Sequence, residues 1–237
     1  MDEFVIQDGL LVSYNGDGGD VVIPDGVTAL RSYVFCCRPT LRSVVIPKSV
    51  RTIGGEAFAG CEALSSVTFS VGLHTIGMWA FRHCTSLETL SLPEGLRVIG
   101  WHAFEGCTSL TAVDLPDSAR DIHGAPFGRC AALTELRADG KLPKEIWKSI
   151  DKVQYCANRL QKGLPLSNRE KRFSSFFFRE IAEKLIAAQD VSALQTLFAM
   201  RKAVRRDWLE EWIARSGDTV VVRTFLMDYR HRAYAPR

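Results

Sequence analysis

The sequence predicts an α+β protein: a solenoid of 23-residue coils, built from short strands and helical turns, followed by an all-helical C-terminal domain. Two observations support this fold class. Apolar residues recur every 23 residues from about residue 4 to residue 138, and a fixed period of this length is typical of solenoids. Beyond residue 141 the period stops, and apolar residues follow the spacing of helices instead.

Five apolar columns define the coil. A single coil cannot bury its apolar edge, so the stacked coils are expected to share one continuous core. Prolines follow the expected strand in four coils and end its pairing, because proline lacks an amide donor. The columns are Ile23, Ile46, Phe69, Leu92 and Leu115; Leu30, Ile53, Ile76, Ile99 and Ile122; Phe35, Phe58, Phe81, Phe104 and Phe127; Leu41, Leu64, Leu87, Leu110 and Leu133; and Val44, Val67, Leu90, Val113 and Leu136.

Glycine-rich stretches in the repeats are interpreted as structural. The Gly54-Gly55 pair lies inside a repeated unit, whereas a phosphate-binding loop occurs once in a chain. The segment Gly16–Asp20, with the sequence GDGGD, is expected to form a turn between two strands of the first coil, because glycine tolerates positive φ. We therefore expect neither a phosphate loop nor a calcium site here.

Four cysteines share the 23-residue period: Cys61, Cys84, Cys107 and Cys130. They are expected to form a buried ladder, since free cysteine behaves as a small hydrophobe. A zinc site is the alternative, but it needs four ligands that converge on one point, and a ladder is a line. Cys36 and Cys37 lie in an eroded repeat and are assigned no redox role. The seven cysteines are an odd number, and no secretory signal precedes them, which favours a reduced, intracellular protein. We expect no metal and no cofactor.

The segment IPKSVRTIGGEAFAGCEALSSV, residues 46–67, resembles the BspA-type leucine-rich repeat of bacterial proteins. The resemblance covers about residues 4–138 and implies a curved solenoid that is used for binding. Many members of that family are surface proteins, so adhesin-like binding is one function that the resemblance implies. The first residues are acidic where a signal peptide would be basic, and no apolar run reaches the length of a membrane span. The sequence therefore favours a cytoplasmic bacterial protein without a membrane partner.

Net charge separates the two predicted domains. Residues 1–140 carry 10 Lys and Arg against 16 Asp and Glu, whereas residues 141–237 carry 20 against 11. The boundary falls at Asp139-Gly140, a turn signal. We therefore predict domains at 1–140 and 141–237. Contact between the oppositely charged domains, within one molecule or between copies, would also explain the asymmetry.

The C-terminal domain is expected to contain a capping helix and further helical pairs. Residues 142–160 are predicted to form one helix that caps the last coil. Residues 169–189 are predicted to form a second helix with Phe177, Ile181 and Leu185 on one face. Asp190 and Asp218 are expected N-caps. An offset of 28 residues relates the segments around them, which resembles two degenerate ankyrin-like helix pairs.

The sequence contains none of the common catalytic signatures. A nucleophile elbow, a zinc-protease helix, a dinucleotide-binding loop and a phosphate-loop lysine are all absent from it. The five histidines have no evident acid or nucleophile partner. These observations predict a non-enzymatic protein that binds another protein.

Two surface columns are candidate binding residues. Arg51, His74, Arg97 and Arg120 form a basic line, and like charges on neighbouring strands repel. Either nearby acids neutralise this line, with Glu94, Asp117 and Asp121 close in sequence, or it binds an anionic partner. Trp79 and His102 share a second column, and Trp101 lies in the column before it. These aromatic residues either pack beneath a neighbouring loop or form a recognition patch.

A basic patch in the C-terminal domain supports an alternative function. Arg201, Lys202, Arg205 and Arg206 lie close together in the sequence and could bind nucleic acid or another polyanion. Basic residues near helix ends also interact favourably with the helix dipole. Binding through this patch would fall steeply with salt, whereas an apolar protein interface would respond little.

Overall fold

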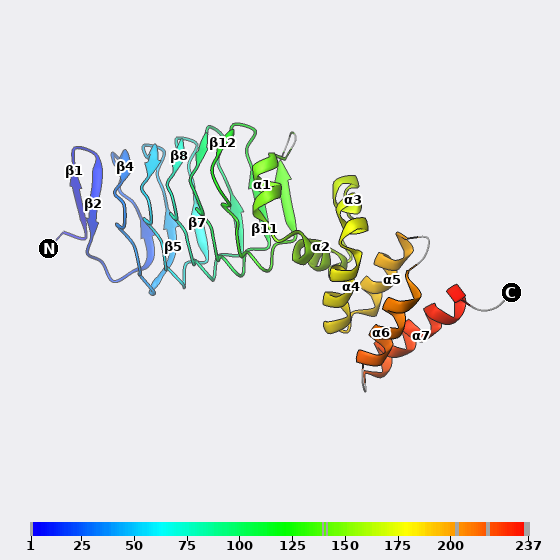
Figure 1. Ribbon diagram of the computed structural model, residues 1–237. Helices are drawn as coiled ribbons and strands as arrows, with labels where there is room; N and C mark the ends of the chain where they lie inside the picture. Colours follow the sequence, from blue (N-terminus) through cyan, green and yellow to red (C-terminus); the bar gives the residue numbers. More distant parts are fainter. Residues whose placement is uncertain (1, 139, 141, 202–203, 217–218, 235–237) are drawn as a thin grey trace. The chain divides into compact units, whose positions relative to one another are not determined.

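The computed structural model describes residues 2–138, 140, 142–201, 204–216 and 219–234. It contains two compact units, residues 1–151 and 152–237. The first is a β-solenoid, and the second is helical (Figure 1). The predicted fold class is therefore confirmed. The units divide after Asp151, whereas the sequence placed the boundary after residue 140, because helix α1 (Lys144–Ser149) is part of the first unit.

Strands of successive coils pair side by side in three sheets. The pairing is antiparallel between β1 and β2 and parallel elsewhere, with partners such as Ile53 and Ile76 one period apart. The seven-stranded sheet has the order β1 (Phe4–Gln7), β2 (Leu10–Tyr14), β4 (Ala29–Leu30), β6 (Thr52–Ile53), β8 (Thr75–Ile76), β10 (Val98–Ile99), β12 (Asp121–Ile122). The others have the orders β3 (Gly19–Val22), β5 (Leu41–Val45), β7 (Ser66–Thr68) and β13 (Glu135–Ala138), β11 (Ala112–Leu115), β9 (Thr89–Ser91).

The phenylalanine column forms a stack of buried rings in the core. Neighbouring ring centroids are 4.9, 4.9, 5.2 and 5.4 Å apart from Phe35 to Phe127, and the rings are parallel within 10°. Tyr14 begins the stack, 4.7 Å from Phe35. All five phenylalanines are at most 1% exposed. The predicted columns therefore form the core of the solenoid, except that Val67, Phe69 and Leu136 are only half-buried.

A glycine column allows the coils to approach closely. A Cβ added at Gly54, Gly77 or Gly100 would lie 2.5–2.7 Å from a backbone atom of the preceding coil. These glycines therefore serve coil packing. The expected turn at Gly16–Asp20 is confirmed in part: residues 15–18 connect β2 to β3, with Gly18 at φ of +91°, whereas Gly19, at φ of +76°, and Asp20 already belong to β3.

The second unit consists of six helices within the described residues. They form consecutive pairs, with α4 against α5 and α6 against α7. The expected N-cap Asp190 is confirmed, since its side chain accepts from the Ala193 amide at 2.9 Å. Asp218 lies outside the described residues. The helices are α2 (Lys152–Gln161), α3 (Asn168–Phe176), α4 (Phe178–Ala187), α5 (Val191–Ala199), α6 (Arg206–Arg215) and α7 (Val220–Tyr234).

Two predicted helices are each broken in the structure. The predicted helix 142–160 ends at Ile150, which is extended with ψ of 153° and buries its side chain. The predicted helix 169–189 breaks at Phe177, whose ψ of 30° ends α3. Phe178 then packs inward with Ile181 and Leu185, while Phe177 stays 41% exposed. Periodicity did not show these breaks, because contacts with other segments decide which residues are buried.

Candidate functional site

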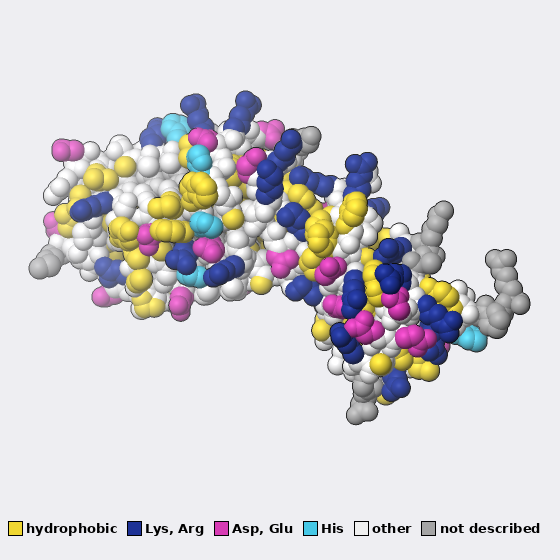
Figure 2. All heavy atoms as spheres, in the orientation of Figure 1, with side chains coloured by type: hydrophobic (Ala, Val, Ile, Leu, Met, Phe, Trp, Pro, Cys, Tyr) yellow, Lys and Arg dark blue, Asp and Glu magenta, His cyan; other side chains and the backbone are white. Residues whose placement is uncertain are grey.

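The basic line predicted from the sequence is continuous in the structure. Its members directly precede strands β6, β8, β10 and β12, and all four side chains are exposed. The His74 amide donates to the Arg51 carbonyl at 2.9 Å, and the Arg97 amide to the His74 carbonyl at 2.9 Å. The Arg120 amide donates to the Arg97 carbonyl at 3.3 Å. Figure 2 shows Lys, Arg and His side chains along one edge of this unit.

The nearby acids do not form ion pairs with this line. Asp121 contacts His123 at 3.1 Å, and Asp117 accepts from the Gly140 amide at 2.9 Å. Arg51 donates to two backbone carbonyls, those of Lys48 at 2.7 Å and Gly72 at 3.0 Å. Within the part of the chain that the structure describes, the four basic side chains have no carboxylate within 4.0 Å. Ion pairs with nearby acids therefore do not neutralise the basic line.

Trp101 is a surface residue. Its side chain is 54% exposed, and its ring stacks on the His123 ring at 6.5 Å with an angle of 15°. The ring covers Gly124, where an added Cβ would lie 2.3 Å from it. Trp79 is half-buried, and the Arg82 guanidinium lies 5.7 Å from its ring centroid. Of the two interpretations of these tryptophans, surface exposure therefore holds for Trp101 and partial packing for Trp79.

The column that contains Trp79 and His102 has a left-handed backbone. The φ angles of Tyr33, Glu56, Trp79 and His102 are +66°, +54°, +56° and +54°. Glycine would adopt this conformation freely, whereas other residues there cost roughly 1 kcal/mol or more. Large side chains therefore occupy this column despite a backbone cost, and they lie at the surface or half-buried.

Sequence reasoning missed a charged cluster beneath the aromatic residues. Glu105 Oε2 lies 3.4 Å from Arg82 Nε and 3.7 Å from His102 Nδ1, and Glu105 Oε1 lies 3.7 Å from Arg129 Nε. The Arg82 guanidinium thus lies between this carboxylate and the Trp79 ring. His123 was missed too. The equivalent positions of the two preceding coils are glycines, Gly77 and Gly100. A histidine in place of that glycine was the feature of the sequence that could have identified this residue.

The basic line and the aromatic residues flank the same strands. Trp101 is four positions after Arg97, and extended chain rises about 3.3 Å per residue, so the two lie at most about 13 Å apart along the coil. The outward position between the columns holds Thr52, Thr75, Val98 and Asp121, of which Thr75 and Val98 are half-buried and Thr52 and Asp121 are exposed. We call this surface the strand-edge face, and it comprises Arg51, His74, Arg97, Arg120, Trp79, Trp101 and His102.

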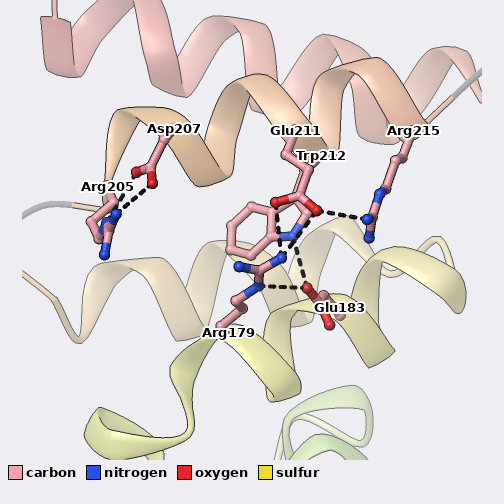
Figure 3. A network of polar contacts seen from close by, with 7 residues as sticks. All are labelled: Arg179, Glu183, Arg205, Asp207, Glu211, Trp212 and Arg215. Atoms are coloured by element: carbon pink, nitrogen blue, oxygen red, sulfur yellow. Dashed lines mark hydrogen bonds and ion pairs between the residues drawn. The ribbon is translucent and has the colours of Figure 1, made fainter.

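The alternative basic patch is largely paired with acids of its own unit. Arg205 contacts both oxygens of Asp207, at 3.0 and 2.5 Å, and this hydrogen bonding lowers the pKa of Asp207 (Figure 3). Arg206 lies 3.8 Å from Glu210. The Arg201 guanidinium lies 5.0 Å from the Phe178 ring and 5.7 Å from the Trp208 ring. Lys202 lies outside the described residues.

A network of polar contacts connects α4 and α6 in the same unit. Arg179 donates to Glu183 at 2.8 Å and to both oxygens of Glu211 at 2.8 and 3.0 Å (Figure 3). Arg215 also contacts Glu211, at 2.7 Å. Hydrogen bonding from Arg179 lowers the pKa of Glu183. These contacts hold two helices together, and they leave Arg179 committed to the protein itself.

The periodic cysteines form a ladder of thiol hydrogen bonds. Their Sγ atoms donate to the carbonyls of Phe35, Phe58, Phe81 and Phe104 at 3.0–3.3 Å. Burial raises the pKa of Cys61 to about 11 and that of Cys130 to about 12. It raises the pKa of Cys84 and Cys107 well above the usual value. The buried placement predicted for this ladder is confirmed, apart from partial exposure of Cys130.

Cys36 and Cys37 differ from the ladder. Their Sγ atoms lie 3.5 Å apart, and Cys37 is exposed. Burial raises the pKa of Cys36 to about 11. The described residues contain no group of three or more His, Cys, Asp or Glu side chains arranged to hold a metal ion.

We expect the ladder cysteines to resist thiol reagents at pH 8 in the folded protein. Only the thiolate attacks, and a raised pKa keeps Cys61 protonated.

Since the pKa of Cys61 is higher in the folded than in the unfolded protein, its contribution to stability is complete below pH 9.0 and is lost as the pH rises towards about 11. Mass spectrometry after timed alkylation measures how fast each cysteine reacts. Rapid labelling of Cys84 without unfolding would contradict the buried ladder.

Comparison with known families identifies a repeat region. Residues 20–150 match the family described as the BspA type leucine rich repeat region, in six copies. A search of curated proteins finds no match. Among the helices of the described residues, none is long and apolar enough to cross a bilayer.

Solved structures share the solenoid. One is a leucine rich cell surface protein from Faecalibacterium prausnitzii A2-165, with 31% identity and a TM-score of 0.54. The match covers 59% of this chain and 37% of that one. Another is a leucine rich repeat protein from T. pallidum, with 31% identity and a TM-score of 0.50, covering 55% of this chain and 75% of that one. This chain thus spans little more than a third of the Faecalibacterium protein.

Proposed function

Because the chain belongs to the BspA-type leucine-rich repeat family, we propose that it is a non-enzymatic scaffold that binds another protein through its strand-edge face. The observation that carries this proposal is the unpaired basic line. Folding places Arg97 and Arg120 at the start of adjacent strands, where their positive charges repel, and Arg51 and His74 continue the line; none of the four has a carboxylate partner among the described residues. A bound anionic group would relieve that repulsion.

The partner that fits this face carries acidic and apolar groups together. Acidic groups would meet Arg97 and Arg120, and charge complementarity would orient the encounter. Apolar groups would cover the exposed ring of Trp101, which offers a large flat area at little cost in side-chain entropy. The Trp101 ring already stacks on the His123 ring, so part of the face is arranged before binding.

Charge reversal at Arg97 tests this proposal. We expect Arg97→Glu and Trp101→Ala each to weaken the partner roughly tenfold or more, as at interface hot spots. The free energy of unfolding should change by less than about 0.5 kcal/mol, because both side chains are exposed. The partner is identified as a protein that the wild-type chain captures in a pull-down and the Arg97→Glu variant does not. Binding affinity and melting temperature are then measured on purified proteins.

Arg42→Glu is the matched control. Arg42 is exposed on β5, in a different sheet, and its reversal changes net charge equally. Because Arg42 lies 3.0 Å from Asp20, a melting curve of this variant checks that it stays folded. Its binding should remain close to that of the wild-type protein. Normal binding by Arg97→Glu would contradict the proposal, and unfolding of Trp101→Ala would make that ring part of the core. Reversal of Arg201, Arg205 and Arg206 would then test the helical unit.

We further propose that the protein works in a reducing compartment, as expected for the bacterial cytoplasm. Its seven cysteines are free thiols, and four of them donate thiol hydrogen bonds inside the core. The similar Faecalibacterium structure is of a cell surface protein, so adhesin-like binding is the competing proposal. Protease treatment of intact source cells, followed by detection of this chain, separates the two.

A further inference from the structure

Helix α3 presents polar side chains inward and aromatic side chains outward. Glu170 and Ser174, one turn apart, are only 7% and 3% exposed. Phe176 is 85% exposed, and Phe177 at the end of the helix is 41% exposed. The free energy of the protein falls when large apolar side chains leave water. This arrangement is therefore the reverse of what the hydrophobic effect produces in an isolated surface helix.

Specific contacts fix the orientation of α3. Glu170 Oε2 accepts from the Ser167 amide at 2.6 Å, and Ser167 Oγ accepts from the Glu170 amide at 3.3 Å, which completes a capping box. Glu170 Oε2 also lies 3.6 Å from Arg159 Nε of α2. Rotation of the helix to bury Phe176 would break these contacts. The outward rings are thus held at the surface by the fold.

Basic residues share the outward face of α3 with the rings. Arg169 precedes Phe173 by four residues, and Arg172 precedes Phe176 by four, so each pair is adjacent on the helix surface. The Phe173 and Phe177 rings stack at 4.4 Å and extend the apolar area past the end of the helix. Residues 152–237 carry 17 Lys and Arg against 9 Asp and Glu, so the whole unit is basic.

We propose that this face, formed by Arg169, Arg172, Phe173, Phe176 and Phe177, docks on an anionic lipid bilayer. The rings enter the boundary between headgroups and acyl chains, where aromatic side chains of interfacial helices lie. Arg172 keeps its apolar stem along the rings while its charged end meets lipid phosphates and carboxylates. The interaction is adsorption to one surface of the bilayer and requires no membrane span.

A lipid surface fits this face better than a folded protein does. The 85% exposure of Phe176 means that the ring projects from the surface, so a rigid partner would need a matching hollow. A bilayer deforms around a projecting ring and supplies many anions without a fixed geometry. The sequence expectation of no membrane partner rested on the absence of an apolar run of about 20 residues. That criterion does not detect adsorption through a short helix.

Vesicle co-sedimentation of the full chain tests the proposal. Vesicles of phosphatidylcholine alone are compared with vesicles that also contain phosphatidylserine. We expect the wild-type protein to bind the anionic vesicles selectively and to be released by added salt. Phe176→Asp should lower the vesicle partition coefficient about tenfold, and Arg172→Glu should lower it as well. Melting curves should show both variants folded, because both side chains are exposed.

Matched controls distinguish binding through this face from nonspecific adsorption. Val220→Asp places the same charge at another exposed apolar residue of the unit, and Lys48→Glu makes the same charge reversal in the solenoid. Both should bind like the wild-type protein. The proposal is overturned if the wild-type protein binds no vesicles, if it binds neutral vesicles equally, or if the controls lose binding to the same extent. The protein could also self-associate in the absence of vesicles. If Phe176→Asp abolished that self-association, the face would be assigned to a second copy of the chain, and the proposal would be overturned too.

Discussion

Phe81→Ala should lower the free energy of unfolding of the solenoid by about 3–5 kcal/mol, the range for large-to-small substitutions in a core. Phe81 is fully buried and stacks on a ring in each neighbouring coil, 4.9 Å from Phe58 and 5.2 Å from Phe104. Loss of the ring leaves a cavity between coils that the hydrogen-bonded ladder cannot readily close. Hydrogen exchange of the amides in β6, β8 and β10 measures the effect within this unit.

Phe81→Met is the control for this substitution. It keeps most of the side-chain volume and should cost less than about 1.5 kcal/mol. Because the coils share one core, the alanine substitution should raise exchange in the coils on both sides of residue 81. A loss below about 1 kcal/mol, or one confined to a single coil, would mean that the rings do not act as a shared core.

We expect Trp212→Ala to destabilise the helical unit by a similar amount, about 3–5 kcal/mol. Trp212 is 2% exposed and is one of the largest buried side chains. Its ring lies 6.2 Å from Phe198 and 6.1 Å from Trp208, and its Nε1 donates to Glu183 at 3.5 Å. The substitution removes packing between three helices. Hydrogen exchange of the amides in α4, α5 and α6 is the measurement.

Trp208→Ala provides the comparison on the same helix. Trp208 lies one turn before Trp212, is half-buried, and has the guanidinium groups of Arg179, Arg201 and Arg205 at 5.1–5.8 Å from its ring. Cation–π contacts at such sites contribute roughly 0.5–1 kcal/mol each. Because Trp208 is only half-buried, less apolar area returns to water than for Trp212, and the loss should be smaller. Equal losses would show that burial does not distinguish these two tryptophans.

Much of the solenoid could be predicted from the sequence because each coil repeats the same local pattern. Equivalent residues such as Ile53 and Ile76 pair one period apart, so a one-dimensional alignment already states the register. The phenylalanine and cysteine columns followed directly from it. The candidate site could be predicted only as columns. Alignment placed Arg97 beside Arg120 and Trp101 near Trp79, but it could not show whether the nearby acids form ion pairs with the basic line.

The sequence by itself determined the repeat architecture, the core columns and the change to helices, because these depend on periodic patterns along the chain. Only the tertiary structure decided the two helix breaks, the Glu105 cluster, the stacking of Trp101 on His123 and the outward rings of α3. Each of these depends on contacts between side chains from different segments. The orientation of Phe176, for example, follows from Glu170 facing Arg159 on another helix. Local periodicity carries no information about such a contact.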